Sequence, residues 1–185
     1  MKKTVLSLTA AAALLAAASA AWATMVIPSS LEQMAGLSDA ILVGLVRDQY
    51  SYWEDRKIFT SVIVDVTEFI KAPGGETPAA LEVKFPGGKV GEIKLEVDQA
   101  PQFTTGEEVL LFLNRSGGVF RPYGFYYGVY KIRLDAGTGR KIVYGPLFNQ
   151  PLVYDLKTMK ADRNTVPSGG EDLSSFTNRL RKLVR

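Results

Sequence analysis

The sequence predicts a mainly β protein, built as a small antiparallel barrel or sandwich with a helix near each end of the mature chain. Apolar runs of strand length recur along the chain, and Gly, Pro and Asn turn signals separate them. Several of these runs are rich in β-branched residues or alternate apolar with polar side chains. Helical spacing of apolar residues occurs only near the two ends. We therefore expect about five to six strands, a short N-terminal helix and an amphipathic C-terminal helix.

The N-terminus predicts export from a bacterial cell. Met1–Lys3 is basic, Val5–Ala20 is an apolar run rich in Ala and Leu, and Ala21–Ala23 has the small-x-small pattern of a signal-peptidase site. A membrane anchor is the alternative, but the apolar core is short for a span of about 20 residues and no positive flank follows it. We expect residues 1–23 to be a signal peptide cleaved after Ala23. The product would be periplasmic or secreted, with no stable membrane anchor.

The composition excludes several classes of function. The chain has 185 residues, with 22 Lys and Arg against 19 Asp and Glu. Loss of the leader removes Lys2 and Lys3, so the mature chain is close to neutral and we expect no nucleic-acid partner. The chain has no Cys and no His. This excludes a Ser-His-Asp triad, a thiol nucleophile and an ordinary zinc site, and we expect no cofactor, no metal and no catalytic residue.

The first element expected after the leader is a short helix. Ser29 followed by Glu32, and Ser30 followed by Gln33, both fit a capping box. In this motif a Ser side chain and a Glu or Gln side chain three residues later satisfy each other's backbone amides. The two alternatives remain open at this point. Gly36 is expected to end the helix.

Two strands are expected next. Residues 40–46 are apolar on both faces, which indicates a buried strand, and Gly44 within them suggests a bulge or a close backbone approach. Residues 58–71 form the longest candidate strand, and a break in their alternation predicts a bulge near Glu68. We expect the polar and aromatic residues 47–57 to form the connection between the two strands.

The middle of the chain is expected to form a hairpin. Pro86–Gly88 would turn the chain between strands at residues 81–85 and 90–97. Ile93, Leu95 and Val97 would then face inward, because they alternate with charged residues.

The next apolar run predicts a central strand. Residues 109–113 are all apolar and have the length of a buried strand. Residues 119–134 predict one long strand or two short ones, and residues 136–139 predict a hairpin turn after them.

The C-terminal part is expected to leave the barrel and return to it. We expect a barrel domain over residues 24–154, an irregular linker over residues 155–170, and a helix over residues 171–185 packed on the barrel. Pro and Gly punctuate the linker, and the helix has an apolar stripe at helical spacing. The stripe comprises Leu173, Phe176, Leu180 and Leu183.

The order of these motifs resembles that of a known family. A short helix leads into "SDAILVGLV", followed by the long strand "FTSVIVDVTEFIKA" and later by "FTTGEEVLLFL". This order resembles the netrin-like module, the OB-type barrel also seen in tissue inhibitors of metalloproteinases, and a group of uncharacterised secreted bacterial proteins. The resemblance covers about Ser30 to Leu134. It implies an OB-like barrel and a protein or glycan partner.

The chain departs from this family at the residues that carry inhibition. Netrin-like modules usually have disulfides, and the metalloproteinase inhibitors chelate the protease metal through an N-terminal cysteine. This chain has no cysteine, and its expected mature N-terminus is Thr24. The inhibitory mechanism is therefore carried by no residue of this chain.

The adjacent acids Glu107 and Glu108 are the candidates for catalysis. A carboxylate-dependent hydrolase needs two acids that face one substrate about 5–9 Å apart, whereas neighbouring strand residues point to opposite faces. We expect these acids to be solvated at the entry of the central strand rather than to be catalytic.

Two aromatic groups are the candidates for binding. Tyr50, Tyr52 and Trp53 lie in the expected 47–57 connection, where exposed aromatic side chains often recognise partners. The alternative for the first group is that the rings fold back onto the barrel instead of contacting a partner. A second group follows Pro122. We expect its rings chiefly to fill the core, and its best candidates for exposed side chains are Tyr123, Tyr126 and Tyr127.

The function expected from the sequence is an exported, non-enzymatic binding or interaction module. Its ligand would be a protein or a glycan. One alternative, suggested by the resemblance alone, is a protein that inhibits metalloproteases, and a carboxylate-dependent hydrolase is another.

Export can be tested by expressing the full chain in a bacterial host and sequencing the N-terminus of the periplasmic product. We expect the sequence to begin at Thr24, because Ala21–Ala23 matches the cleavage pattern. A product that retains Met1 and stays in the membrane fraction would contradict the signal peptide.

Overall fold

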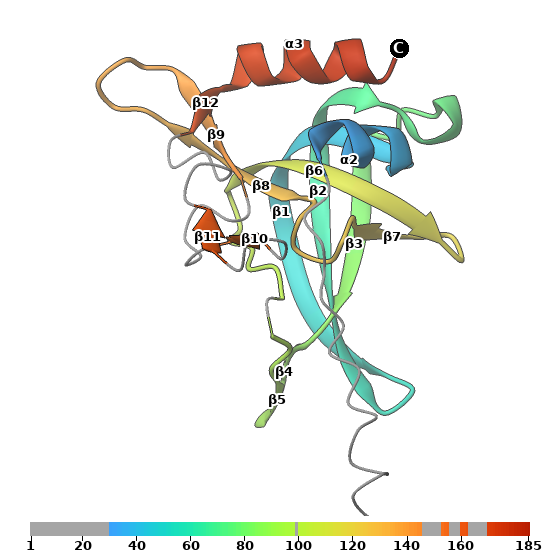
Figure 1. The fold of residues 1–185 in the computed structure, drawn as a ribbon. Coiled ribbons are helices and arrows are strands. Elements are labelled where there is room, and N and C mark those ends of the chain that lie inside the picture. The colour runs from blue at the N-terminus through green and yellow to red at the C-terminus, as the bar shows by residue number, and fades with distance from the viewer. Residues whose placement is uncertain (1–29, 99, 146–152, 156–159, 163–169) are drawn as a thin grey trace, which may run out of the picture.

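The structure is a computed structural model that describes residues 30–98, 100–145, 153–155, 160–162 and 170–185. The expected signal peptide lies outside the described residues. The described part is mainly β, as predicted, with helices α2 (Leu31–Leu37) and α3 (Leu173–Leu183) (Figure 1). Neither they nor any other helix in this part is long and apolar enough to cross a membrane.

The main sheet has eight strands in the spatial order β1–β2–β3–β7–β6–β8–β9–β12. Their bounds are β1 Ala40–Glu54, β2 Lys57–Lys71, β3 Ala80–Pro86, β6 Glu108–Ser116, β7 Val119–Pro122, β8 Val129–Leu134, β9 Lys141–Tyr144 and β12 Glu171–Asp172. Two small antiparallel sheets pair β4 (Gly88–Val90) with β5 (Ile93–Leu95) and β10 (Val153–Asp155) with β11 (Lys160–Asp162). A short 3₁₀ helix, η2 (Pro73–Gly75), follows β2.

Strand β1 has partners on both sides. It pairs with β2 along most of its length and with β6 from Ala40 to Leu45. Strand β3 pairs with β7 in parallel through Val83 and Phe120, whereas the other pairs of the main sheet are antiparallel. The pairings from β1 through β2, β3, β7 and β6 therefore return to β1. Strands β8, β9 and β12 extend outward from β6.

Strand β6 separates two apolar clusters. Val109, Leu111 and Leu113 pack in the first cluster, which also takes alternate residues of β1, β2 and β3. Leu110 and Phe112 point the opposite way and pack in the second cluster, with residues of both helices. All five side chains are 0% exposed, so the predicted central strand is confirmed. Burial of each one contributes about 1.5–3 kcal/mol before the entropy cost.

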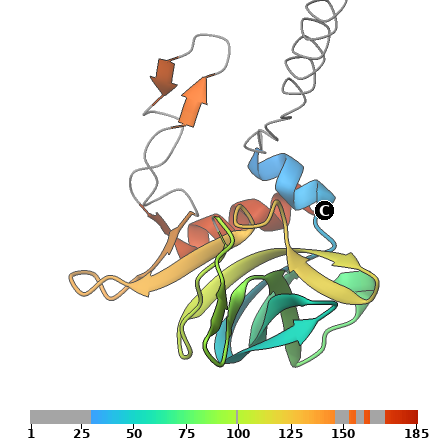
Figure 2. The same ribbon diagram turned by 90° about the horizontal axis from the view of Figure 1, so that it is seen from below.

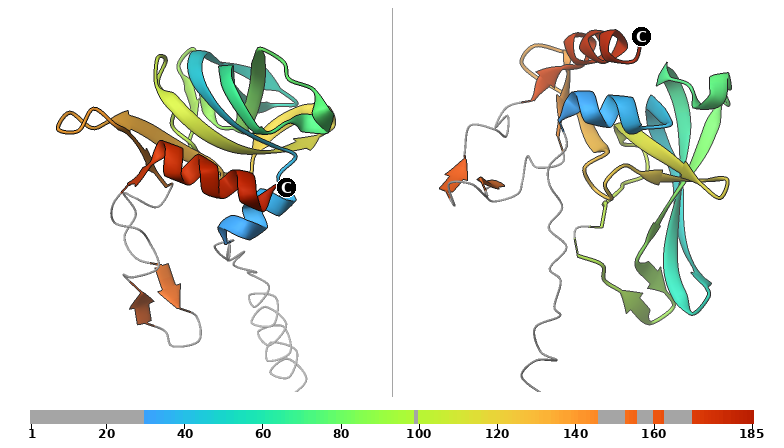
Figure 3. Two further views of the ribbon diagram at one scale, coloured as in Figure 1. Left: turned by 90° about the horizontal axis from the view of Figure 1, so that it is seen from above. Right: turned by 45° about the vertical axis from the view of Figure 1, so that its right-hand side comes forward.

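Both helices lie on one side of the strand assembly, where they cover the second cluster (Figures 2 and 3). Helix α2 begins at the second of the two expected capping boxes, because the Ser30 hydroxyl accepts from the Gln33 amide at 3.2 Å and the Gln33 side chain accepts from the Ser30 amide at 3.0 Å. The helix runs past Gly36 and ends at Leu37, so the expected end at Gly36 is wrong by one residue.

Helix α3 confirms the amphipathic C-terminal helix. Asp172 caps it by accepting from the Ser175 amide at 3.1 Å, and Phe176 and Leu180 are buried against the sheet. The residues just before the helix, β12, pair with β9, so the C-terminal segment also joins the main sheet. Within the expected irregular linker, Asp155 ends β10 and Lys160–Asp162 form β11, which pairs with β10. Residues 156–159 and 163–169 lie outside the described part.

The irregularities expected in the first two strands are present. The register passes from Val43 opposite Glu68 to Gly44 opposite Val66, which leaves Thr67 as the bulged residue next to Glu68. A Cβ atom added at Gly44 would lie 2.6 Å from the backbone oxygen of Asp65. The glycine therefore permits a close approach of the two strands, as predicted.

The expected connection at residues 47–57 is instead strand almost throughout. Strand β1 continues to Glu54, and the turn consists of Asp55 and Arg56, with φ angles of 46° and 62°. Tyr50, Tyr52 and Trp53 therefore lie on a strand and not in a loop. The reason is cross-strand pairing, since Tyr52 lies opposite Phe59 and such aromatic pairs stabilise a sheet despite the polar residues around them.

The expectation that residues 81–85 and 90–97 pair as one hairpin is also wrong. Strand β3 pairs with β2 and β7, while β4 and β5 form their own hairpin beyond it. The Gly87 amide donates to the Ile58 carbonyl at 2.9 Å, so the chain continues past Pro86 instead of folding back on β3. Ile93 and Leu95 are 56% and 38% exposed, so they do not face inward.

The Gly44 contact can be tested by Gly44→Ala, with Gly36→Ala as the control. We expect Gly44→Ala to lower the free energy of unfolding by about 1–3 kcal/mol, because its methyl group would meet backbone that cannot yield. At Gly36 nothing lies within 4 Å of an added Cβ, and alanine in a helix should raise stability by about 0.5–1 kcal/mol. Urea denaturation measures both changes. Equal stabilities of the two variants would contradict the close approach.

Candidate functional site

A groove of about 820 Å³ lies between the distal half of β1, the β4–β5 hairpin and the segment that follows β5. We call it the β1 groove. Its lining comprises residues 49–51, Thr60, Phe85, residues 87–89, 94–98 and 100–103. Consecutive residues line it on two sides, at 49–51 and at 100–103, so backbone as well as side chains forms its walls.

A chain of hydroxyl contacts fixes the wall on the β1–β2 side. The Ser51 hydroxyl lies 2.9 Å from the Thr60 hydroxyl, which in turn donates to the Gly87 carbonyl at 2.7 Å. A Cβ at Gly88 would lie 2.3 Å from the Ser51 hydroxyl oxygen, so glycine is required where β4 crosses the β1–β2 hairpin. This part of the groove is therefore polar and closely packed.

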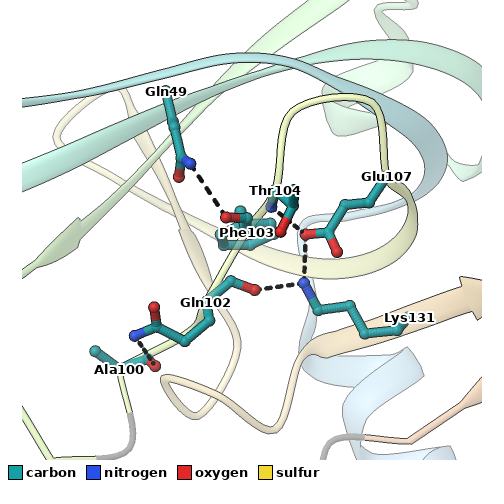
Figure 4. Close-up of polar contacts among 7 residues, drawn as sticks. All are labelled: Gln49, Ala100, Gln102, Phe103, Thr104, Glu107 and Lys131. Atoms are coloured by element: carbon teal, nitrogen blue, oxygen red, sulfur yellow. Dashed lines mark hydrogen bonds and ion pairs between the residues drawn. The ribbon is translucent and has the colours of Figure 1, made fainter.

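Four polar groups hold the opposite wall (Figure 4). The Gln49 side chain donates to the Phe103 carbonyl at 3.1 Å, which ties this wall to β1. The Lys131 ammonium donates to the Gln102 carbonyl and to the Glu107 carboxylate. The same carboxylate accepts from the Thr104 amide at 2.8 Å. The segment from 102 to 104 is thus fixed by contacts on both sides.

Glu107 and Glu108 are ion-paired and mostly buried, which corrects the expectation that they are solvated. Their side chains are only 23% and 20% exposed. Glu107 pairs with Lys131, and Glu108 pairs with Lys141 at 2.8 Å. Burial lowers the pKa of the Lys131 ammonium, and the bond to Glu107 offsets only part of this effect. The two acids have separate partners and do not converge on one point.

The face of the β1–β2 hairpin opposite Ser51 and Thr60 is aromatic and encloses a lysine. The Lys84 ammonium lies 4.4 Å from the centre of the Phe59 ring and 5.3 Å from that of Tyr52, and it contacts the Glu54 carboxylate at 2.5 Å. Burial alone lowers the pKa of Lys84, but hydrogen bonds to Glu54 and Tyr52 outweigh it and leave the pKa raised. The Tyr50 hydroxyl donates to Glu82 at 3.2 Å, and this bond raises the Tyr50 pKa.

The structure places the first aromatic group beside the β1 groove. Tyr50 and Tyr52 share the face that encloses Lys84, with ring centres 5.8 Å apart. Trp53 follows in the alternation and points to the other face, the same face as Ser51. Tyr50 and Trp53 are each 48% exposed, which leaves both rings available to a partner.

The three tyrosines of the second aromatic group pack in the second apolar cluster, which agrees with the interpretation that this group chiefly fills the core. Tyr127 is therefore not one of its exposed candidates. Tyr127 is only 9% exposed, and its ring stacks on that of Tyr126 at 4.3 Å. Tyr123 and Tyr126 also pack against this cluster. Burial raises the pKa of Tyr126. The two aromatic groups form separate sets.

The two sets lie at opposite ends of β1. The Tyr123 amide donates to the Phe112 carbonyl, and Phe112 pairs with Ile41 near the start of the strand. Tyr50 is roughly 30 Å further along that strand, at about 3.3 Å of rise per residue. The structure therefore does not bring the two predicted sets together.

Sequence reasoning missed the polar residues of the groove, including Gln49, Ser51 and Thr60. One signal was available for Thr60, because it interrupts a face of β2 that otherwise carries Ile58, Val62 and other apolar residues. A hydroxyl at such a position requires a partner, and the partner is at the groove. The segment at 96–103 gave no comparable signal, because its place depends on contacts distant in sequence.

Among the residues that the structure describes, no group of three or more His, Cys, Asp or Glu side chains could hold a metal ion. No protein-family model matches the chain, and no curated protein matches its sequence. The resemblance to netrin-like modules therefore stays a prediction.

The role of Glu107 in holding the groove wall can be tested by Glu107→Gln. The variant keeps an acceptor for the Thr104 amide but leaves the Lys131 charge without its carboxylate, so we expect a loss of about 1–3 kcal/mol in the free energy of unfolding. Glu108→Gln is the control, because its partner Lys141 is half exposed and such pairs contribute about 0–1 kcal/mol. A larger effect of the control would contradict the assignment.

Proposed function

We propose that this chain is an exported, non-enzymatic binding module built on an OB-like barrel of the netrin-like type. An OB-type barrel is a five-stranded, partly open Greek-key barrel. The pairing order β1–β2–β3–β7–β6, with its return to β1 and its parallel β3–β7 contact, supports this assignment. The leader sequence supports a periplasmic or secreted location.

The β1 groove is the observation that carries the proposed binding function. Ligand sites are concave, have volumes of about 300–1,000 Å³, and combine apolar walls with a few placed polar groups. The groove has a volume of about 820 Å³, with Tyr50, Phe85 and Phe103 as its aromatic lining and Ser51 and Thr60 among its polar groups. Half-exposed Tyr50 and Trp53 on the adjoining strand add rings of the kind that contact partners.

The charges of the groove favour a protein or a glycan over a nucleic acid. Lys89 and Lys94 are matched by Glu96 and Asp98, and Lys94 already contacts Glu96 at 2.5 Å. A phosphate backbone is bound chiefly by uncompensated positive charge, which this set does not provide. The groove therefore suits a ligand with little net charge.

The two alternative functions have less support. Inhibition of a metalloprotease rests on the family resemblance alone, and the chain has no cysteine to chelate a metal. Hydrolysis by carboxylates would need two converging acids, whereas Glu107 and Glu108 have separate lysine partners.

The proposed function can be tested by screening the mature protein against an oligosaccharide array that includes peptidoglycan fragments, and against a random peptide display library. For ligands found by either route, we expect Trp53→Ala to weaken binding about tenfold or more, because tryptophan is a frequent energetic centre of binding surfaces. The melting temperature should stay nearly unchanged, since Trp53 is half exposed.

Leu134→Ala is the matched control, because Leu134 is also exposed and lies on β8 rather than beside the groove. Its affinity should equal that of the wild type. The proposed function is contradicted if neither library yields a ligand, or if Trp53→Ala binds as tightly as Leu134→Ala.

A further inference from the structure

The distal half of β1 is an open edge of the sheet. Strand β6 pairs with β1 only as far as Leu45. The last backbone bonds on that side join Val46 to Glu107 at 2.9 Å and to Gly106 at 2.8 Å. Beyond Val46, no strand among the described residues pairs with β1 on the side away from β2.

The register of the β1–β2 hairpin shows which backbone amide and carbonyl groups of β1 point toward the open edge. A two-residue turn with positive φ at both positions is closed by a hydrogen-bonded pair, here Glu54 and Lys57. Backbone groups then alternate along β1 between the β2 side and the open side. The amide and carbonyl groups of Trp53, Ser51 and Gln49 therefore point toward the open side.

An independent contact supports this alternation. The Gln49 amide donates to the Asp48 side chain at 2.8 Å, and an amide directed at β2 would be engaged in the ladder instead. Asp48 thus caps the first donor of the edge. The amides of Ser51 and Trp53 are left as donors for another chain.

The β1 groove runs along this edge. Residues 49–51 line one wall, and the lining includes Tyr50, whose side chain belongs to the opposite face, so the backbone itself borders the groove. The stretch from Gln49 to Trp53 is about 13 Å long at about 3.3 Å per residue. Such a length matches an added strand of about five residues, a common strand length.

We propose that the β1 groove binds an extended peptide segment of another protein, which adds a strand to β1 by pairing with the backbone groups of Ser51 and Trp53 and with the Gln49 carbonyl. This inference rests on the proposed binding function and specifies its ligand. Amide donors and carbonyl acceptors along an extended edge match those of a peptide backbone, which adds to such an edge as a further strand. Unpaired edges are usually blocked by charge or proline, but the stretch from Tyr50 to Trp53 has neither.

The side chains on either side of the edge specify the bound peptide further. Alternate residues of an added strand would point into the groove toward Leu95, which is 38% exposed, whereas Phe103 lies almost buried behind the lining. The intervening residues would lie beside Tyr50 and Tyr52 on the opposite face. The expected ligand is therefore a segment with apolar residues at alternate positions and little net charge.

The first test measures amide hydrogen exchange in the free protein by NMR. We expect the amides of Ser51 and Trp53 to exchange much faster than those of Tyr50 and Tyr52, because only the latter point at β2. A peptide that binds the edge should then slow exchange at Ser51 and Trp53 specifically. Equal protection of all four amides in the free protein would overturn the proposal, because the edge would already be occupied.

The second test compares Ser51→Pro with Ser51→Ala in binding to peptides selected from the random display library. Both variants lose the hydroxyl contact with Thr60, but only proline removes the backbone donor, and proline is tolerated at a strand edge. We expect Ser51→Pro to bind at least about tenfold more weakly than Ser51→Ala. Circular dichroism confirms that both variants are folded. Equal affinities of the two folded variants would overturn the proposal.

A peptide with N-methyl groups at alternate positions provides a test that leaves the protein unchanged. One of the two alternating patterns should abolish binding, and the other should not, because an added strand directs only every second amide at β1. Equal tolerance of both patterns would overturn strand addition.

The remaining outcomes separate this inference from the proposed function. Binding of an oligosaccharide that depends on Trp53, with no peptide selected, would overturn the peptide inference and leave the binding module standing. A dimer that Ser51→Pro dissociates and Ser51→Ala does not would identify a second copy of the chain as the occupant, and would likewise overturn the inference. Failure of both libraries would overturn both proposals.

Discussion

The fold depends on the burial of β6 on both of its faces. Its five apolar residues from Val109 to Leu113 supply side chains alternately to two clusters, one between the strands and one beneath the helices. The strand also pairs with β1 on one side and with β7 and β8 on the other. Because one strand belongs to both clusters, the strand assembly and the helices are stabilised together rather than as separate units.

The β1 groove arises because β1 is longer than its partner. Strand β6 begins at Glu108, and the chain before it turns at Gly106, so β1 continues past Val46 with a partner on one side only. The segment that leads into β6 returns alongside, where Glu107 and Lys131 hold it. The groove is the space between this segment and the unpaired part of β1. The β4–β5 hairpin adds a further wall. The groove therefore results from a mismatch in strand length together with this hairpin and one partly buried ion pair.

The sequence predicted the elements whose signal is local. Apolar residues buried on two faces identified β6, β-branched residues identified β2, and helical spacing identified α3. It missed elements that depend on distant pairing. The polar residues before Glu54 suggested a connection, but β2 pairs with them, and Pro86 suggested a hairpin turn, but the chain continues to β4. The aromatic candidates were divided for the same reason, because Tyr127 packs in a cluster with strand and helix residues that are distant in sequence as well as on its neighbour Tyr126.

The enclosure of Lys84 has a consequence for the chemistry of the chain's amines. Its ammonium group is in contact with a carboxylate and two aromatic rings, and the residue is buried. Acylating reagents attack the free, neutral amine, so this lysine should be modified last, after solvent-exposed lysines such as Lys94. The order of lysine modification in a mass spectrum would thus report whether the β1–β2 hairpin is intact in a given preparation.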